Sequence, residues 1–316
     1  MKATTKLCLE AVPPFNFGLS AGIFSNGDRQ IRKYEKNMFW QVIRVNGKLL
    51  LANVWSSGSV DKPKLKTELK TGSELTRNDT KNAEKTIRSL FNLNLNLAEF
   101  YDEIKTDEVM WRLTRELLGL KIPTTQTVFE ALIDSIVEQQ ISIKVASYIK
   151  NKLTKKFGDT LTVEGKVFYV YPTPQKLASV DVDEIRECGL SQRKSEYIKG
   201  ISELVVAGEL NLEQLERWDS TEDIINELDK VRGVGVWTAE LTMLRGMQKL
   251  EALPADDLGL KRVISRYYCN GETITGAHAR QIAEKWGPWK GLAAYYLIVA
   301  DMKDIKAQSG TLSSFC

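Results

Sequence analysis

Apolar and polar residues alternate in two short segments near the N-terminus, a pattern typical of β-strands with one buried face. The segments are residues 39–45, FWQVIRV, and residues 48–55, KLLLANVW, and Asn46-Gly47 separates them. This dipeptide favours the two-residue turn of a β-hairpin because both residues tolerate positive φ angles. The pattern therefore predicts an antiparallel hairpin.

Further segments extend this region. Residues 56–63 are polar and predict a loop, whereas residues 63–70 alternate weakly, as an exposed third strand would. A helix is predicted near 80–91. Asparagine and leucine then alternate over 92–97, which predicts another strand with one buried face. We therefore expect residues 1–104 to form an α/β domain with antiparallel strands.

The strand signals stop at about residue 105, and helical periodicity replaces them. Residues 128–141 place apolar side chains on one helical stripe, and residues 142–158 form a second helical pattern that stops at Gly158. We expect residues 105–316 to form a bundle of short helices with a frayed tail, SGTLSSFC. Further helical runs are predicted at 183–189, 191–207, 220–230, 236–247, 257–268, 276–286 and 290–303.

The composition is that of an ordinary globular protein, with 43% apolar and 27% charged residues among 316. The net charge is +3, so any basic surface must be local. The four cysteines form no CxxC pair, which argues against a zinc ribbon or an iron–sulfur cluster. The single histidine, His278, argues against histidine-based catalysis and multi-histidine metal sites. We therefore expect carboxylate chemistry.

The segment LDKVRGVGVWTAE interrupts two helical runs with Gly233-Val-Gly235. Glycine permits a sharp turn and lets a ligand approach the backbone closely. The helix that follows would present unpaired amides and its positive dipole end, which together favour phosphate binding. Lys230 and Arg232 lie beside this turn. The segment predicts a helix–hairpin–helix at about 224–247; a tight turn that needs glycine for packing alone is the alternative.

The stretch LPADDLGLKRVISRYY at 253–268 follows, and it places Asp256 and Asp257 before an amphipathic helix. Aspartate is a favoured N-cap because its carboxylate accepts hydrogen bonds from the first free amides of a helix. One of two adjacent aspartates can cap the helix while the other remains available for chemistry.

These two stretches resemble the helix–hairpin–helix, Gly/Pro-Asp superfamily of DNA glycosylases. The shared pattern is a Gly-Val-Gly hairpin with Thr-Ala three residues on, then Pro-x-Asp-Asp with Lys-Arg four residues after the second aspartate. EQQIS at 138–142, GLSQRKSEYIKGISEL at 189–204 and WGPWKGLAAYYL at 286–297 are similar to other segments of the superfamily. PPFNF and SLFNLNLNL resemble the N-terminal domain of the bacterial 3-methyladenine glycosylase II family.

The resemblance thus spans nearly the whole chain, and it implies an α+β fold. An N-terminal antiparallel-sheet domain, similar to the TATA-binding protein, would precede an all-α glycosylase bundle in two subdomains. The hairpin and the catalytic aspartate, which precedes the helix at 257–268, would both belong to that bundle.

One position indicates which branch of the superfamily the chain resembles. Bifunctional members carry a lysine nucleophile two residues after the second hairpin glycine, whereas Trp237 stands here. Members with an iron–sulfur cluster end in four cysteines, whereas this C-terminus has Cys316 alone. The resemblance implies a monofunctional glycosylase of base excision repair without an iron–sulfur cluster. It would flip out alkylated purines of the 3-methyladenine type and hydrolyse their N-glycosidic bond.

The resemblance also assigns roles to residues. Asp257 is the expected catalytic carboxylate, because it has the family spacing to Lys261-Arg262, and Asp256 is left as the helix cap. Gln140 or Ile141 is expected to fill the space of the flipped base. The expected DNA contacts are Lys230, Arg232, Gly233, Gly235, Trp237, Thr238, Gln140 and Ile141. The expected base pocket comprises Trp237, Leu241, Gln139, Phe129 and Ile298. The expected ligands of a monovalent cation, Na⁺ or K⁺, are the backbone carbonyls of Val231 and Gly233.

Several aromatic residues are assigned more loosely. Tyr295 and Tyr296 are further candidates for the base pocket, whereas Trp286 and Trp289 are assigned to the core. His278 is assigned to a helix surface.

The expected partner is damaged double-stranded DNA, and we expect a monomeric, cytoplasmic protein without a membrane span. The lysines of 144–156 form either a DNA-facing patch or a solvated helix face. Two alternatives for the function stay open. The first is an oxidised-purine or hypoxanthine glycosylase of the same superfamily. The second is a non-catalytic helix–hairpin–helix DNA-binding protein, in which Asp257 would be a cap and nothing more.

Overall fold

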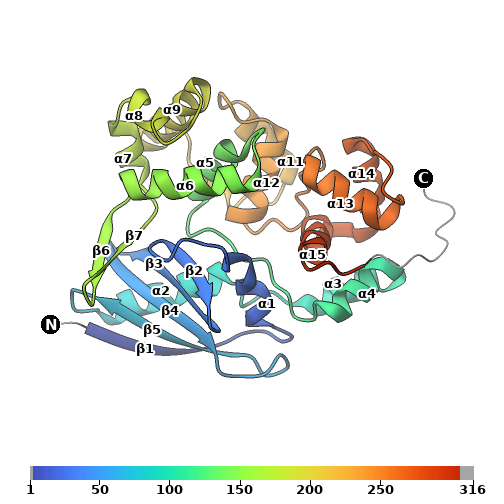
Figure 1. Cartoon of the computed structure of the whole chain (residues 1–316), viewed down its shortest axis with the longest axis horizontal. Helices are drawn as coiled ribbons and strands as arrows, with labels where there is room; N and C mark the ends of the chain where they lie inside the picture. The colour runs from blue at the N-terminus through green and yellow to red at the C-terminus, as the bar shows by residue number, and fades with distance from the viewer. Residues whose placement is uncertain (1–2, 307–316) are drawn as a thin grey trace.

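The computed structural model describes residues 3–306, and the tail expected to fray lies outside them. Within this range, the N-terminal part is a five-stranded antiparallel sheet in the order β1-β5-β4-β3-β2, and the later part is mainly helical (Figure 1). The expected α+β fold is therefore confirmed. The strands of this sheet are β1 (Ala3–Glu10), β2 (Arg32–Glu35), β3 (Met38–Val45), β4 (Lys48–Ser56) and β5 (Lys64–Thr71).

The hairpin at Asn46-Gly47 forms as predicted. Strands β3 and β4 pair with Val45 opposite Lys48, and the two turn residues have φ angles of 49° and 76°. These left-handed angles match the twist of the flanking strands. The third predicted strand is β5, which pairs with β4 on one side and β1 on the other.

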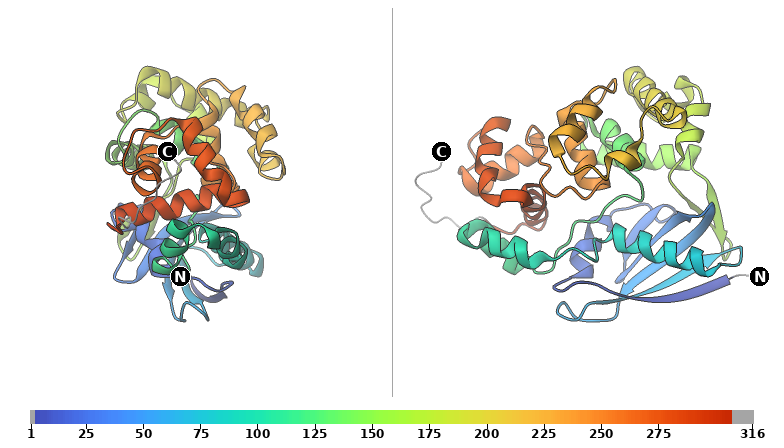
Figure 2. Two further views of the ribbon diagram at one scale, coloured as in Figure 1. Left: turned by 90° about the vertical axis from the view of Figure 1, so that its right-hand side faces the viewer. Right: turned by 180° about the vertical axis from the view of Figure 1, so that it is seen from behind.

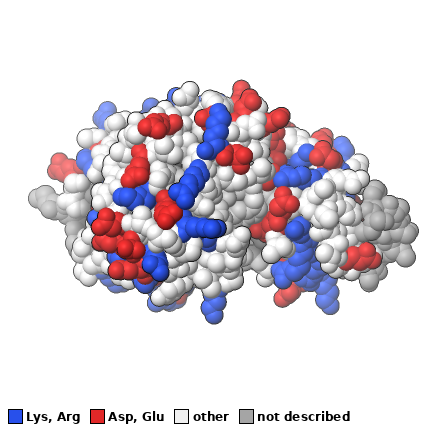
Figure 3. Space-filling model, turned by 90° about the horizontal axis from the view of Figure 1, so that it is seen from above, with Lys and Arg blue, Asp and Glu red and all other residues white. Residues whose placement is uncertain are grey.

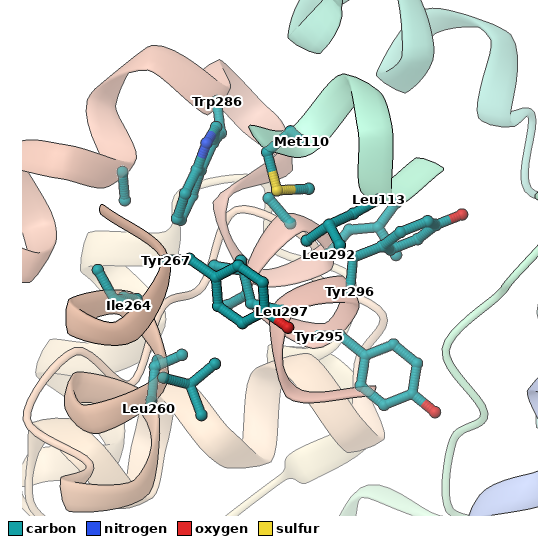
Figure 4. Packing of buried hydrophobic residues seen from close by; sticks show 14 of the residues in the cluster. Met110, Leu113, Leu260, Ile264, Tyr267, Trp286, Leu292, Tyr295, Tyr296 and Leu297 are labelled. Atoms are coloured by element: carbon teal, nitrogen blue, oxygen red, sulfur yellow. The ribbon is translucent and has the colours of Figure 1, made fainter. Parts of the chain in front are cut away.

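The helical part packs around two hydrophobic cores. Figure 2 shows the two groups of helices side by side, with the C-terminal group at the far end of the molecule from the sheet. Helices α5 to α12 build the central core; α3, α4 and α13 to α15 build the C-terminal core, part of which is drawn in Figure 4. None of the helices in residues 3–306 combines the length and apolarity that crossing a membrane requires. The first helices are α1 (Phe17–Ala21), α2 (Arg77–Leu90), α3 (Leu97–Glu103), α4 (Glu108–Glu116), α5 (Val128–Glu138), α6 (Ile143–Phe157), α7 (Pro174–Ser179) and α8 (Val182–Arg186). The others are α9 (Gln192–Ala207), α10 (Leu212–Leu215), α11 (Thr221–Asp229), α12 (Val236–Gly246), α13 (Leu258–Tyr268), α14 (Gly276–Ala283) and α15 (Lys290–Met302), with short 3₁₀ helices at Gly22–Phe24, Ile104–Thr106 and Glu284–Trp289.

The strand predicted over 92–97 is wrong, because this segment forms turns that lead into α3. Asn92 has a φ of 49°, and its Nδ2 donates to the Ile122 carbonyl at 2.7 Å. Asn96 caps α3 by accepting from the Ala98 amide at 3.0 Å. Asparagine side chains that bond nearby backbone groups compete with a strand ladder. The alternation therefore reflects buried leucines on turns.

A second correction concerns the region expected to be all helical. Strands β6 (Thr160–Val163) and β7 (Lys166–Tyr169) form a hairpin there, and it packs on the face of the sheet opposite α2. Val163 contacts a small apolar cluster that includes Val42 and Leu51 of the sheet. Four-residue strands are too short to produce a clear alternation, so the sequence pattern did not reveal them.

The proposed division at residue 104 remains a prediction. Leu97, Phe100 and Ile104 already pack in the C-terminal core, beside residues of α15. The chain therefore joins the helical part of the structure at α3, several residues before position 105, where the strand pattern of the sequence ends.

Helix α12 contributes to both cores, since Leu244 packs in the C-terminal core and Met243 in the central core. Its contact with α5 is close. A Cβ atom at Gly246 would lie 2.8 Å from the Ala131 Cβ and 3.0 Å from the Val128 Cα. The absence of a side chain at Gly246 lets the two antiparallel helices approach. The C-terminal end of α5 is thereby fixed beside the N-terminal end of α12.

A buried lysine joins the sheet domain to the helical part. The side chain of Lys121 is completely buried, and its Nζ donates to the carbonyls of Val12 at 2.8 Å and Leu93 at 3.2 Å. The ring of Phe15 lies 5.3 Å from the same nitrogen. Burial lowers the pKa of Lys121 to about 8.

We predict a specific pH dependence from Lys121. Between pH 8 and about 10.4, its usual pKa, the folded protein loses this proton first, so the unfolded state holds more protons and stability rises with pH. The free energy of unfolding of the wild type should therefore rise relative to that of Lys121→Met over this window. Urea unfolding at pH 7.5 and 9.5 measures the difference; an equal response of the two proteins would contradict the assignment.

Candidate active site

The predicted helix–hairpin–helix is present. Helix α11 ends at Asp229, α12 begins at Val236, and Gly235 is the N-cap of α12 without a side-chain hydrogen bond. Gly233 has a φ of 93°, and a Cβ there would lie 2.3 Å from the Tyr197 ring. A Cβ at Gly235 would meet nothing within 4 Å. Packing against Tyr197 therefore requires a glycine at position 233, whereas Gly235 borders open space.

The first turn of α12 presents free hydrogen-bond donors. Within the described residues, the amides of Gly235, Val236 and Trp237 donate no hydrogen bond. A helix N-terminus adds a partial positive charge to such amides, so the turn suits an anion. The predicted contacts Lys230 and Arg232 flank it; their side chains are 69% and 78% exposed and pair with nearby glutamates. Exposed pairs of this kind contribute little, so a phosphate can replace the glutamates.

The segment between α5 and α6 projects from the same side. Gln140 is exposed and has a φ of 56°, whereas Ile141 is partly buried against the central core. A positive φ is uncommon for residues other than glycine, so neighbouring contacts must hold Gln140 in this conformation. Lys194 provides such contacts, because its Nζ donates to the carbonyls of Val137 and Gln139.

Gln139 connects this segment to the hairpin. Its Nε2 donates to the Gly233 carbonyl at 2.9 Å and to the Thr238 Oγ1 at 3.0 Å. The amide of Gln139 thus holds two backbone segments together, and both of its N–H groups are occupied. Gln139 is a predicted base-pocket residue, and its observed contacts make it a support of the hairpin.

Asp257 makes two contacts with its two carboxylate oxygens. Oδ1 accepts from the Leu260 amide at 2.8 Å and caps α13, while Oδ2 accepts from the Trp237 Nε1 at 3.3 Å. The assignment of the cap to Asp256 is therefore wrong. The Asp256 carboxylate lies 3.7 Å from Arg280 and is 64% exposed. Asp257 therefore caps α13 with one carboxylate oxygen and contacts Trp237 with the other.

Three side chains of α12 share one face of the helix. Trp237, Leu241 and Arg245 are spaced four residues apart, and Leu241 is buried without belonging to either core. This face therefore looks into the junction between the two cores. Arg245 Nη1 donates to Glu138 Oε2 at 2.6 Å. Burial raises the pKa of Glu138, but the charges of Arg245 and Lys150 outweigh it and bring the pKa to about 2.

Other predicted pocket residues pack in or against the hydrophobic cores. Phe129 is buried in the central core, nine residues before Glu138, which is about 14 Å along the axis of α5. Its place in the base pocket stays a prediction. Ile298 is half-buried on α15 against the C-terminal core. The segment from Phe15 to Phe24 packs with the sheet.

The aromatic residues assigned to the core are confirmed there. Trp286 is fully buried and donates to Asp107 at 3.0 Å, and Trp289 packs on Phe100 with ring centroids 5.9 Å apart. Tyr296, a pocket candidate, is also fully buried and donates to the Leu120 carbonyl.

Most lysines of α6 are paired within the protein. Lys150 forms ion pairs with Asp134 and Glu138. Lys155 and Lys156 also form ion pairs, and Lys152 donates a hydrogen bond to a backbone carbonyl. On the face seen in Figure 3, acidic and basic groups are interspersed, and uncharged surface runs through the middle. His278 is half-exposed on α14.

The two backbone carbonyls that are predicted to bind a cation each accept one hydrogen bond. Val231 O accepts from the Val234 amide, and Gly233 O accepts from Gln139. Each carbonyl oxygen has a second lone pair, so both fit a monovalent cation. Cys8 and Cys188 are free thiols, and no cluster of three His, Cys, Asp or Glu side chains occurs in residues 3–306.

Two surface hollows lie away from these residues. One of about 630 Å³ lies between α2 and Gln248, and another of about 530 Å³ lies beside Glu240 and Arg280. Neither is lined by Asp257 or Trp237. The candidate site is therefore defined by the convergence of α5, α12 and α13.

The two hairpin glycines predict different responses to alanine. Gly233→Ala should lower the free energy of unfolding by about 2 kcal/mol or more, because alanine is strained at this φ and meets the Tyr197 ring. Gly235→Ala is the matched control and should change stability by less than about 0.5 kcal/mol, because its Cβ meets open space. Urea unfolding distinguishes the two; equal losses would show that packing does not set the hairpin geometry.

Comparison with known proteins agrees with this geometry. Residues 133–288 match the HhH-GPD superfamily of base excision DNA repair proteins. The chain is 31% identical over 213 residues to the DNA-3-methyladenine glycosylase of Bacillus subtilis, which covers 67% of this chain and 70% of that protein.

Solved structures extend the comparison to the N-terminal domain. The 3-methyladenine DNA glycosylase from Archaeoglobus fulgidus is similar with a TM-score of 0.83 and 28% identity, covering 94% of this chain and 98% of that one. The 8-oxoguanine glycosylase/lyase of Clostridium acetobutylicum shares the fold, with a TM-score of 0.75 and 23% identity over 96% of this chain and 98% of that one. By motif, fold and sequence similarity, the chain belongs to the HhH-GPD superfamily of base excision DNA repair proteins.

Proposed function

We propose that this protein is a monofunctional DNA glycosylase that removes alkylated purines of the 3-methyladenine type. The observation that carries the proposal is the contact between Asp257 and Trp237, with Trp237 standing where a lysine nucleophile would be required for strand cleavage. The relative in Bacillus subtilis is a DNA-3-methyladenine glycosylase, which supports the same substrate class.

Asp257 supplies the charge that bond cleavage needs. As the base leaves, positive charge develops at C1′ of the sugar, and a fixed carboxylate stabilises it or orients the attacking water. The Leu260 amide and the Trp237 indole each hold one carboxylate oxygen. The carboxylate is therefore oriented before DNA binds, so little reorganisation is required during the reaction.

The hairpin would hold the DNA backbone beside this carboxylate. The free amides of Val236 and Trp237 are suited to a phosphate, and Arg232 adds attraction that is independent of sequence. A monovalent cation on the carbonyls of Val231 and Gly233 would add positive charge next to the same phosphate.

Base flipping would use the segment after α5. Extracting a base from the stack costs a few kcal/mol, and a side chain that fills the vacated space offsets part of that cost. Gln140 is exposed in a left-handed conformation, whereas Ile141 is tied to the core. We therefore favour Gln140 as the inserted residue. The link from Gln139 to the hairpin would fix the distance between insertion and phosphate binding.

Asp257→Asn should lower the rate of base release by about 100-fold or more, because the carboxylate charge is lost. Asparagine still caps a helix, so the free energy of unfolding should change by less than about 1 kcal/mol. Asp256→Asn is the matched control and should retain activity, because Asp256 points to Arg280. Single-turnover release of methylated base from duplex DNA measures all three proteins. Full activity of Asp257→Asn, or release of no base by the wild type, would contradict the proposed catalytic role.

The absence of a lysine at position 237 predicts the fate of the DNA strand. Release of a base should leave an intact abasic strand that breaks only after alkali treatment, because tryptophan cannot form a Schiff base with the sugar. Gel analysis with and without alkali makes the comparison. Strand breaks without alkali in proportion to the released base would indicate a bifunctional enzyme instead.

A further inference from the structure

Tyr295 has a buried hydroxyl that the described part of the protein leaves without a partner. The residue is 6% exposed, and its hydroxyl oxygen makes no hydrogen bond within residues 3–306. Leaving such a group unsatisfied costs about 1–3 kcal/mol. Figure 4 shows the ring pointing away from the packed side chains of Leu292 and Leu297, with the hydroxyl at the outer edge of the cluster.

The next residue of the same helix is also a buried tyrosine, and its hydroxyl has hydrogen-bond partners. The Tyr296 hydroxyl lies 2.9 Å from the Leu120 carbonyl and 3.1 Å from the Tyr101 hydroxyl. Two adjacent buried tyrosines are therefore treated differently: one is bonded inside the core and the other is left free to bond something else.

Arg245 connects Tyr295 to the catalytic side of the junction. Among its contacts with described residues, the guanidinium makes one hydrogen bond, through Nη1 to Glu138, which leaves further N–H groups available. Burial lowers the pKa of Arg245, but Glu138 and the more distant carboxylates of Asp134 and Asp257 outweigh this. Burial raises the pKa of Tyr295, and the charge of Arg245 opposes that rise. Arg245 thus lies within electrostatic reach of both Tyr295 and Asp257.

The helix faces place the same groups together. Arg245 follows Trp237 and Leu241 on the face of α12 that looks into the junction between the cores, and Tyr295 precedes Ile298 by one turn of α15. Both helices contribute to the C-terminal core, through Leu244 and Tyr295 respectively. Both helices therefore meet at this junction, where Tyr295 is 6% exposed and the Arg245 side chain is 37% exposed.

We propose that the Tyr295 hydroxyl and the free N–H groups of Arg245 form a pair of hydrogen-bond donors for the inner edge of the extruded base. This proposal rests on the glycosylase function proposed above and extends its substrate class to purines with a 6-oxo group. Bases with an oxo group at the purine 6-position, such as 7-methylguanine and hypoxanthine, present an acceptor to these donors. Bases with a 6-amino group, such as 3-methyladenine, present a donor and gain less.

The direction of the tyrosine proton follows from electrostatics. The guanidinium charge attracts the hydroxyl oxygen and repels its hydrogen, so the O–H bond points away from Arg245 and toward a ligand. Tyr295 therefore acts as a donor, although a hydroxyl can in general also accept.

Tyr295→Phe removes the donor and keeps the ring. We expect single-turnover release of hypoxanthine and 7-methylguanine from duplex DNA to fall about 10-fold, and release of 3-methyladenine to change less than about 3-fold. The thermal unfolding temperature should stay the same or rise, because a buried unpaired hydroxyl is removed. Tyr296→Phe is the matched control: it should lower the unfolding temperature and leave the ratio of the three release rates unchanged.

The outcomes separate this proposal from the one it rests on. Release by the wild type with an unchanged ratio in Tyr295→Phe would overturn the donor role alone. A lower unfolding temperature of Tyr295→Phe would also overturn it, since the hydroxyl would then be bonded within the protein. Release of no base by the wild type would remove the glycosylase function and the donor role together.

Discussion

The close packing of α5 on α12 is the constraint on which the candidate site depends. Gly246 has no room for a side chain against Ala131 and Val128, so the two antiparallel helices are held at one separation along their length. Where α5 ends, the Glu138 side chain reaches Arg245, the residue before Gly246, and the Gln139 side chain reaches Gly233, which precedes α12. A wider separation would break both contacts and would move the exposed Gln140 away from the hairpin. The glycine near the end of α12 therefore positions chemistry that lies three turns away.

A second consequence of this packing is that α12 serves two cores at once. Its sides toward α5 and α15 are occupied by apolar contacts, which leaves the face with Trp237 and Leu241 directed into the junction. Asp257 enters the same junction from α13, because its helix cap fixes one carboxylate oxygen and turns the other toward the indole. Local helix-capping chemistry thus orients the proposed catalytic group, and helix stability and the proposed reaction use different oxygens of the same carboxylate.

The sequence predicted those features that depend on local rules. Asn46-Gly47 requires left-handed angles, and Gly233-Val-Gly235 interrupts a helix, so both turns were predicted correctly. The strand predicted over 92–97 failed because Asn92 bonds to the backbone of another segment and Asn96 caps α3, which periodicity cannot show. The cap was assigned to Asp256 because the resemblance gave Asp257 another role, but one Asp257 oxygen caps the helix while the other contacts Trp237. Phe129 has the right chemistry for a base pocket, but its place on α5 became visible only when the helices were packed. The contact between Arg245 and Glu138 joins residues 107 positions apart, so no local pattern could predict it.

The charges at the junction are balanced in a way that suits the proposed substrate. Glu138 pairs with both Arg245 and Lys150, and Lys150 also pairs with Asp134. The positive charges of Arg245 and Lys150 are therefore matched by two carboxylates of α5. Arg245 can therefore offer hydrogen-bond donors without making the junction strongly positive. A strongly positive junction would repel a cationic methylated purine, whereas a neutral row of pairs leaves the carboxylate of Asp257 to attract it. Recognition of a base edge by donors and attraction of a cationic base are therefore compatible, because Glu138 neutralises the residue that supplies the donors.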